Sequence, residues 1–339
     1  MSVLRKPAFG VELYGYVDAC TLLAEIQLAE RLGFASVWLG DSQLLWRDLW
    51  VLLGAGAATT SRITLASGVT NPVTRHPTVT AGAVMSLQEL SGGRAILGIG
   101  VGFTSVVMLG QQRATRAELR RAVELIRALC SGESVPGEGG ALRLVFGAPG
   151  QCPPIVVSGS GPKMLRLAGE IGDGVVLQGC PIGSDALPTM LGHVREGRQA
   201  AGRGAEPCTA YLSIAASVHP DRAPALAAVK SHVAVSLMKP RWPASPAAMS
   251  VAEAARAAYR SDDHMSPEAN ARFAAVIPDA VIPEFAIAGT PDECIASCRW
   301  LFEGGIDEIT IRPYGVEGAS RAAAIEAFAR DVMRPMLQQ

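Results

Sequence analysis

The chain has 339 residues, of which 49% are hydrophobic, and its 30 basic and 31 acidic residues leave a formal net charge of −1. That length and hydrophobic content are sufficient for a large buried core. Balanced charge and an aromatic content of only 5% do not favour a nucleic acid or a membrane surface as a partner, so we expect neither.

Short apolar runs alternate along the chain with longer segments of helical periodicity. The predicted strands are residues 9–13, 35–40, 62–67, 94–100, 154–159, 174–179, 211–218 and 308–313. The predicted helices are residues 20–32, 48–58, 77–90, 114–130, 162–171, 185–201 and 317–336. Buried parallel strands that alternate with helices form an α/β fold, and eight such units favour a closed barrel over an open sheet. We therefore predict a single (β/α)8 barrel, or TIM barrel, over residues 1–339.

Two segments interrupt this alternation. Residues 131–152 are rich in glycine and proline, which predicts an excursion before the fifth strand. Residues 219–284 are rich in alanine and too long for one crossover, which predicts a helical insertion between the seventh and eighth strands. Long insertions of this kind are often lids, so we expect this one to lie over the barrel mouth.

Two features bear on the location of the protein. The N-terminal segment lacks the long apolar run of a signal peptide, and no stretch of 18 or more apolar residues is present. Seven cysteines without the spacing of a disulfide framework are typical of reduced, intracellular thiols. We therefore expect a cytoplasmic protein.

Active sites of such barrels lie at the carboxyl ends of the strands, so the residues that follow each predicted strand are the first candidates. Glu12, Tyr14 and Tyr16 come at the end of the first strand, and Asp41, Ser42 and Trp46 follow the second. Gln178 comes at the end of the sixth strand. These polar and aromatic side chains are candidates for contacts with a substrate or for proton transfer.

The sequence SGSGPK gives the best local signal for a phosphate. Gly159, Ser160 and Gly161 leave the fifth strand, and Pro162 occupies a natural first helical position. Free N–H groups and the positive end of a helix would face an anion, to which Lys163 could add a charge. The alternative is a plain turn between a strand and a helix.

Two glycine motifs lie near the carboxyl ends of the third and fourth strands. Gly98, Gly100 and Gly102 are two residues apart, so we expect them on one strand face, where they would leave room for a planar ring. The alternative is dense packing inside the barrel. Gly68 and Asn71, in the sequence GVTNP, indicate an irregular turn that would support a ligand, or else an ordinary loop.

The histidines and cysteines show no metal-ligand spacing, so we expect no metal site. No nucleophile motif such as GxSxG is present either. A chain without a reactive group of its own, but with room for a flat ring, indicates a bound organic cofactor.

Five segments carry a resemblance to a known family. They are VWLGDSQLLWRD (37–48), ITLASGVTNPVTRHPTVTAGAVMSLQELSGGRAILGIGVG (63–102), IVVSGSGPKMLRLAGEIGDGVVLQG (155–179), FAIAGTPDE (285–293) and GIDEITIRP (305–313). Together they resemble the bacterial luciferase-like superfamily, and within it the branch that uses coenzyme F420 and includes methylenetetrahydromethanopterin reductase. The resemblance covers nearly the whole chain and is weakest over the insertion.

The resemblance implies F420 as the cofactor, with FMN as the alternative. It implies a non-prolyl cis peptide bond between Gly68 and Val69, which forms a bulge behind the deazaflavin ring. Thr70 and Asn71 would lie near the ring, and Gly100 and Gly102 would belong to the same cofactor site.

The resemblance also assigns the remaining cofactor contacts. The segment Gly159–Lys163 would hold the phosphate of the cofactor. Asp173 and Gln178, at the start and the end of the sixth strand, would contact the ring or the ribityl chain. Trp46 would form a wall on the substrate side. Homodimers are common in the family, so we expect one here.

Two departures from the dehydrogenases of this family bear on the reaction. Those enzymes carry Asp-His where this chain has Asp41-Ser42, and a carboxylate where it has Phe103. General acid–base catalysis contributes roughly 100- to 10,000-fold, so this loss disfavours alcohol oxidation. We predict instead a reductase that transfers a hydride from the reduced deazaflavin to an activated C=C or C=N bond of a small molecule. Asp41, Ser42, Tyr14, Tyr16 or water would supply the proton.

Three other functions remain open on the sequence. The first is an FMN-dependent monooxygenase of the same fold. The second is a catalytically silent cofactor-binding protein, which Ser42 and Phe103 would permit. The third, a metal-dependent barrel hydrolase, is disfavoured by the lack of clustered ligands.

Overall fold

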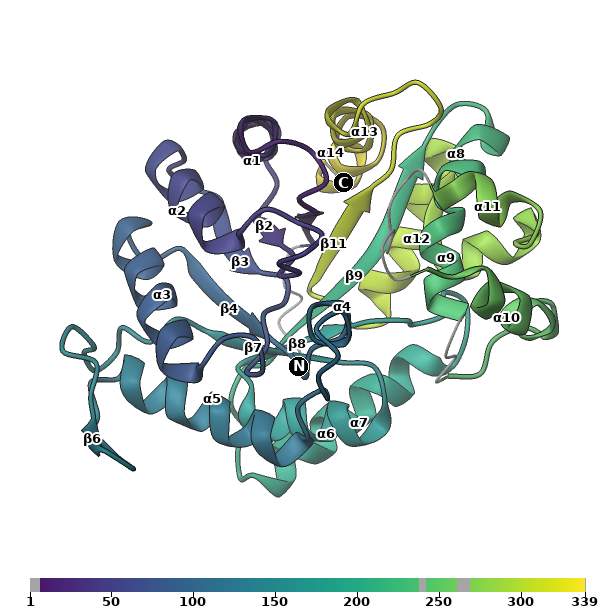
Figure 1. The fold of residues 1–339 in the computed structure, drawn as a ribbon. Coiled ribbons are helices and arrows are strands. Elements are labelled where there is room, and N and C mark those ends of the chain that lie inside the picture. Colours follow the sequence, from purple (N-terminus) through teal and green to yellow (C-terminus); the bar gives the residue numbers. More distant parts are fainter. Residues whose placement is uncertain (1–6, 238–241, 261–268, 339) are drawn as a thin grey trace.

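The computed structural model describes residues 7–237, 242–260 and 269–338. Its strands form a parallel sheet at the centre of a ring of helices (Figure 1). The barrel strands are β1 (Ala8–Leu13), β2 (Ser36–Leu39), β3 (Thr64–Ser67), β4 (Ala95–Ile99), β7 (Ile155–Gly159), β8 (Gly174–Leu177), β9 (Thr209–Val218) and β11 (Glu308–Pro313). Because β1 pairs with both β2 and β11 and β8 pairs with β9, the sheet closes on itself. The predicted TIM barrel is confirmed.

Helices follow the barrel strands and pack on their outer side. They are α1 (Ala19–Leu32), α2 (Leu49–Thr59), α3 (Pro77–Leu90), α5 (Arg116–Cys130), α6 (Pro162–Ile171), α7 (Ala186–Ala200), α12 (Pro291–Glu303) and α13 (Arg321–Phe328). Side-chain caps fix where several begin: Asp18 caps α1, and Thr115 forms a capping box with Glu118 at α5. The predicted helix 317–336 is divided, because α13 continues as a π-helix, η3 (Ala329–Met333), and then as α14 (Arg334–Leu337).

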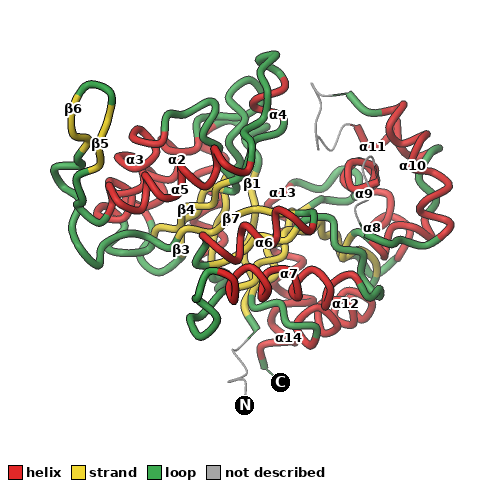
Figure 2. The backbone as a smooth tube through the Cα atoms, turned by 90° about the horizontal axis from the view of Figure 1, so that it is seen from below, coloured by secondary structure: helices red, strands yellow, loops and turns green. Residues whose placement is uncertain are grey.

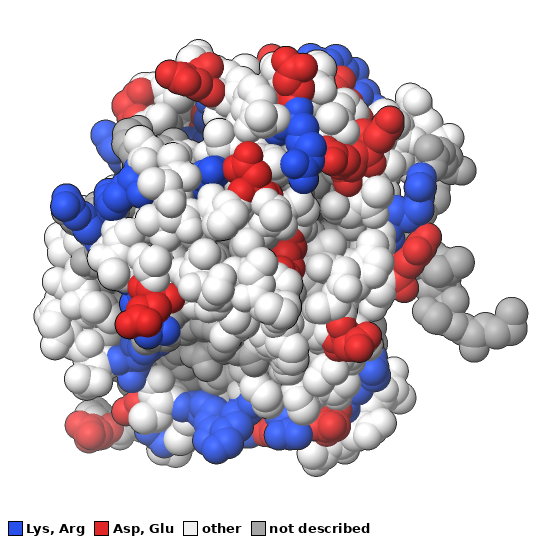
Figure 3. Space-filling view, turned by 90° about the vertical axis from the view of Figure 1, so that its right-hand side faces the viewer, with Lys and Arg blue, Asp and Glu red and all other residues white. Residues whose placement is uncertain are grey.

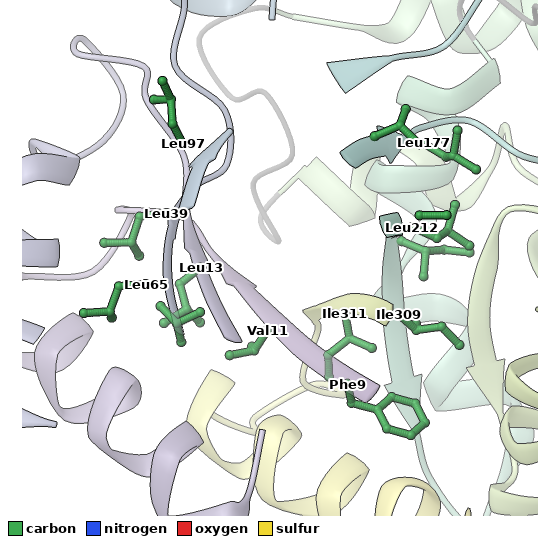
Figure 4. Packing of buried hydrophobic residues seen from close by; sticks show 14 of the residues in the cluster. Phe9, Val11, Leu13, Leu39, Leu65, Leu97, Leu177, Leu212, Ile309 and Ile311 are labelled. Atoms are coloured by element: carbon green, nitrogen blue, oxygen red, sulfur yellow. The ribbon is translucent and has the colours of Figure 1, made fainter. Parts of the chain in front are cut away.

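Side chains alternate between the two faces of the barrel strands. The outward set, which includes Leu39 and Leu65, lies between the strands and the flanking helices (Figure 4). The inward set forms a separate apolar cluster of Trp38, Ala66, Ile96, Val156, Val176 and Tyr211. This inner layer fills the barrel below its mouth, as is usual for the fold.

One strand of the parallel sheet was not predicted. β10 (Ala286–Gly289) pairs with the last residues of β9, from Ala215 to Val218, whereas β8 pairs with the first residues of β9. Its sequence is AIAG, and alanine and glycine have low β-propensity, so the segment gave no strand signal. β10 therefore extends the sheet near the mouth, beyond the end of β8.

The two predicted interruptions have regular structure of their own. Within residues 131–152, β5 (Val135–Gly137) and β6 (Gly140–Leu142) form an antiparallel hairpin. Between β9 and β10 lie α8 (Arg222–Ala228), α9 (Lys230–Leu237), α10 (Pro246–Ala258), α11 (Asn270–Ala274) and the 3-10 helix η2 (Asp279–Glu284). Residues 238–241 and 261–268 of the predicted insertion lie outside the described residues.

A second buried apolar cluster holds these helices to the sheet. It joins Val233 and Phe273 of the helices to Ala215 of β9 and Ala286 of β10. Figure 2 places α9, α10, α11 and the short helix α4 (Thr104–Val107) on the side of the barrel that faces away from both termini. The insertion therefore lies at the mouth of the barrel.

The outer face of the molecule over the insertion carries charges of both signs. Figure 3 shows that basic and acidic side chains are interspersed there, mostly around the margin of this face. Within the described ranges, no helix combines the length and apolarity needed to cross a bilayer.

Asp173 lies at the amino end of the barrel, away from the mouth. Its carboxylate accepts hydrogen bonds of 2.9 Å from Arg127, Arg203 and the backbone N–H of Ile155. The expectation that Asp173 contacts the cofactor was therefore wrong, because only the carboxyl ends of the strands face the mouth. Burial alone would raise the pKa of Asp173, but the Ile155 N–H and the Arg127 guanidinium hold it below its ordinary value.

The Asp173→Asn variant tests this structural role. Loss of the charged acceptor should lower the free energy of unfolding by about 1–3 kcal/mol near neutral pH. A carboxyl group whose pKa is lowered by folding stabilises above its unfolded-state pKa and loses that contribution as the pH falls through its folded-state pKa. Urea unfolding from about pH 7 to pH 3 should therefore show a deficit that shrinks in acid. A deficit that stays constant with pH would contradict an ionic role.

Candidate active site at the barrel mouth

A small cavity lies at the mouth, directly above the inner apolar layer. Its lining comes from six strands and the residues that follow them: Glu12, Trp38, Gly68, Val69, Val176, Gln178, Ser213 and Thr310. The predicted residues Gly68, Val69 and Gln178 are thus brought together. A larger groove between residues 182–189 and 242–245 contains none of the predicted site residues.

The peptide bond between Gly68 and Val69 is cis, as the resemblance implied. The loop is held against β4 from both sides, since Thr70 N–H donates to the Gly98 carbonyl at 3.0 Å and Gly100 N–H donates to the Thr70 carbonyl at 2.9 Å. Val69 consequently forms one wall of the cavity. We call residues 68–70 the bulge.

The glycines of the fourth strand make room chiefly for this bulge. A Cβ atom on Gly98 would collide with the Ser67 carbonyl oxygen, and one on Gly100 would lie 3.3 Å from the Val69 side chain. Dense packing, the alternative considered above, therefore describes Gly98. Gly102 does not share this strand face, because β4 ends at Ile99 and Gly102 adopts a φ of +82° in the following loop.

Asp41 is held between two loops at the mouth. Thr70 Oγ1 donates to its carboxylate at 2.7 Å, and Arg75 Nε lies 3.3 Å from the same oxygen. Arg75 also bridges to Asp48, which caps α2. Asp41 thus connects the loops after β2 and β3. Ser42 is buried beside it, and its carbonyl accepts the N–H of Trp46.

The amide group of Asn71 is directed into its own loop. Oδ1 accepts from the N–H groups of Val73 and Thr74 at 3.0 Å, and Nδ2 donates to Ser105 Oγ at 3.1 Å. The side chain therefore organises the loop after β3.

The helix at Pro162 begins as the sequence predicted. Gly161 is the N-cap residue in extended conformation, and no side chain caps α6 there. Trp242, from the insertion, donates to the carbonyl of Ser160 at 2.8 Å and leaves the helix-start amides to other acceptors. Lys163 is exposed in the first turn. This end of α6 lies at the mouth because α6 follows β7.

Three aromatic side chains stand together beside the first two strands. The rings of Tyr14 and Trp46 stack at 4.3 Å with an interplanar angle of 13°. Tyr16 packs edge-on against both, at 6.2 Å from Tyr14 and 6.0 Å from Trp46. The predicted residues Tyr14 and Trp46 therefore form one wall.

The mouth also holds a buried carboxylate, Glu12, to which the sequence assigned no role. Glu12 accepts a hydrogen bond from Tyr14 OH at 2.9 Å. It also forms an ion pair with Arg312, whose Nε lies 2.9 Å from the carboxylate. Ser213 Oγ donates to it as well. The guanidinium of Arg312 also lies 5.7 Å from the centre of the Tyr14 ring. We call Glu12, Tyr14, Ser213 and Arg312 the mouth cluster.

Burial governs how the members of the mouth cluster ionise. Burial raises the pKa of Tyr14 well above its ordinary value, so its phenol keeps its proton at neutral pH. Burial alone would lower the pKa of Arg312, but the Glu12 carboxylate beside it holds that pKa above its ordinary value. The cluster therefore pairs a permanent cation with a proton-bearing phenol around one carboxylate.

A signal for this cluster was present in the sequence. Glu12 interrupts the otherwise apolar strand FGVEL, and Arg312 lies in the buried strand EITIRP. A charged residue inside a buried strand is rarely left unpaired, so each calls for a partner of opposite charge. Their pairing was hidden because they are 300 residues apart.

Comparisons with known proteins give a consistent result. A model of the family described as luciferase-like monooxygenase matches residues 2–308. The 5,10-methylenetetrahydromethanopterin reductase of Methanolobus tindarius is 30% identical over 340 residues, which cover 96% of this chain and 99% of the relative. The reductase of that name from Archaeoglobus fulgidus is 31% identical over 318 residues, which cover 89% and 92%.

A solved structure agrees with these relatives. The coenzyme F420-dependent tetrahydromethanopterin reductase from Methanopyrus kandleri matches with a TM-score of 0.79 and 25% sequence identity. The match covers 97% of this chain and 99% of that one.

Alanine at two glycines tests how the bulge is seated. In Gly98→Ala, the new Cβ would also lie 3.0 Å from Trp38, so we expect a loss of about 1–3 kcal/mol in the free energy of unfolding. Gly82→Ala is the control, since a Cβ in the middle of α3 has no neighbour within 4 Å and should stabilise by about 0.5–1 kcal/mol. Urea unfolding measures both. A Gly98→Ala variant as stable as the unchanged protein would show that this close approach does not matter.

Proposed function

Since the chain belongs to the luciferase-like monooxygenase family, we propose that it is an F420-dependent oxidoreductase acting on a small molecule at the barrel mouth. The observation that carries this proposal is the cavity between the bulge and Glu12, on the same side of the barrel as the uncapped start of α6. The cavity itself has room for about one water molecule, and a flat ring would lie against the bulge beside it. An anionic tail would meet the start of the helix.

The described residues fit such a cofactor. Gly68 and Val69 would support the ring from behind, and Gln178 would contact its edge. The amides of Gly161 and Lys163 and the exposed ammonium of Lys163 would hold the phosphate. When bound, the deazaflavin supplies a site that accepts or donates a hydride and does not readily react with oxygen.

The mouth cluster would manage the proton. Glu12 lines the cavity, and Tyr14 OH is bonded directly to it. Tyr14 would give its proton to the anion that hydride addition leaves on the substrate and regain one from solvent, while Glu12 holds the phenol in place. The carboxylate of Asp41 is instead engaged by Thr70 and Arg75. We therefore assign the acid–base role to Glu12 with Tyr14, in place of Asp41 or Ser42.

The proposed direction is reduction of an activated C=C or C=N bond. Ser42 and Phe103 stand where the dehydrogenases of the family carry histidine and a carboxylate. Reduction of such a bond needs one hydride and one proton, and it needs no base to deprotonate an alcohol. The stacked Tyr14 and Trp46 would place a planar acceptor beside the ring.

Cofactor titration is the first test of this proposal. Fluorescence titration of the purified protein should give micromolar binding of F420 and much weaker binding of FMN. Lys163→Glu should weaken F420 binding at least tenfold without lowering the unfolding temperature, because a carboxylate repels phosphate yet suits the first turn of a helix. Arg195→Glu is the matched control, since it makes the same charge change at an exposed site near the middle of α7. Binding of FMN but not F420 would overturn the cofactor assignment.

Turnover tests the assignment of the acid–base pair. With reduced F420 and a panel of cyclic enones and cyclic imines, the return of the oxidised-F420 absorbance reports hydride transfer. Glu12→Gln should lower the rate roughly 100- to 10,000-fold while F420 still binds. Asp41→Asn should act mainly by lowering the unfolding temperature. If Asp41→Asn instead abolished turnover at unchanged stability while Glu12→Gln stayed active, the assignment would be wrong.

A further inference from the structure

Helix α9 of the insertion brings one side chain to the buried ion pair of the mouth cluster. Nη1 of Arg312 lies 3.3 Å from Nδ1 of His232, and both side chains are buried. A guanidinium has donors and no acceptor, so Nδ1 of His232 must accept this hydrogen bond. The ring is therefore neutral at Nδ1, and its proton is carried by Nε2.

The hydrogen bond to His232 holds a second nitrogen of the rigid Arg312 guanidinium. The guanidinium of Arg312 is planar, and its Nε already donates to Glu12. One hydrogen bond leaves a plane free to rotate about that bond, whereas two bonds from different nitrogens define its orientation. His232 thus determines the orientation of the guanidinium. Because the Glu12 carboxylate is bonded to that guanidinium, its orientation toward the cavity depends on His232 as well.

The placement of α9 does not depend on His232. The backbone N–H of Ser231 donates to Asn270 Oδ1 at 2.7 Å, and Lys230 Nζ lies 2.9 Å from Asp279. Val233 and Leu237 are buried in the apolar cluster that joins the insertion to β9 and β10. Removal of the imidazole should therefore leave the helix in place while the contact with Arg312 is lost.

We infer that His232 is a positioning residue, which orients Arg312 and thereby the Glu12 carboxylate through the acceptor atom Nδ1. This inference rests on the proposed function, in which Glu12 and Tyr14 transfer the proton. It makes the insertion part of the active site, since the guanidinium is fully oriented only when α9 is seated on the barrel. The hydrogen bond between His232 of α9 and Arg312 of β11 is the contact through which the insertion reaches this ion pair.

Two substitutions separate the acceptor atom from the shape of the ring. In His232→Asn, the side-chain oxygen can occupy the position of Nδ1 while the ring is lost. In His232→Phe, a ring of similar size is kept while the acceptor is lost. A role in orienting Arg312 predicts that Asn preserves function and Phe does not. A role in packing predicts the opposite.

The first measurement needs neither cofactor nor substrate. NMR of the full-length protein labelled with 15N follows hydrogen exchange at the Nε–H of Arg312, which is assigned by its disappearance in Arg312→Lys. We expect slow exchange in the unchanged protein and in His232→Asn, and exchange at least tenfold faster in His232→Phe. Equal exchange rates in all three proteins would overturn the inference.

The second measurement is the oxidation rate of reduced F420 with the best acceptor of the enone and imine panel. His232→Phe should lower this rate about 10- to 100-fold, the range for loss of a hydrogen bond to a charged group, with F420 affinity unchanged. His232→Asn should remain close to the unchanged protein. Full activity in His232→Phe, or equal loss in both variants at unchanged unfolding temperature, would overturn the inference. Failure of the unchanged protein to bind F420 would count against the proposed function instead. The exchange experiment would still test whether His232 holds the Arg312 guanidinium.

Discussion

The buried ion pair between Glu12 and Arg312 joins the first and last strands of the barrel, and the polar half of the mouth is built around it. Moving two charges out of water costs several kcal/mol per ion, and their attraction offsets this only with good geometry and additional hydrogen bonds. The structure supplies those bonds from Tyr14 and Ser213 on Glu12 and from His232 on Arg312. Because each of these hydrogen bonds restricts a side chain, together they hold the ion pair in a single geometry. A proton-transfer site requires such a fixed geometry.

The other half of the mouth is organised by backbone packing. The bulge at residues 68–70 lies against Gly98 and Gly100, and Asp41 fastens the adjoining loops through Thr70 and Arg75. In this half of the mouth, the side chain of Val69 forms an apolar wall. In the other half, the mouth cluster contributes a carboxylate and a phenol. A flat redox ring between them would have a support on one side and proton chemistry on the other.

Predictions from local patterns and from resemblance differed in their reliability. The strand and helix periodicity gave all eight barrel strands, and the resemblance gave the cis peptide at Gly68. Roles assigned to single polar residues were less secure. Asp41 follows a strand as an active-site carboxylate would, yet the structure engages it with Arg75. Asp173 sits in a matching segment but precedes its strand, and the rule that sites lie at the carboxyl ends of barrel strands already disfavoured a cofactor contact there.

The sequence by itself determined where strands and helices form, because hydrophobic periodicity, glycine stops and helix caps act over a few residues. It also determined that the barrel interior must hold charges, since Glu12 and Arg312 lie within buried strands. Only the tertiary structure decided that these two meet, that Ser213 and Tyr14 complete the set, and that His232 reaches it from the insertion. Apart from Tyr14 and Glu12, which are two positions apart, those contacts join residues from 80 to 300 positions apart. Their geometry follows from barrel closure and strand register, which no local pattern encodes.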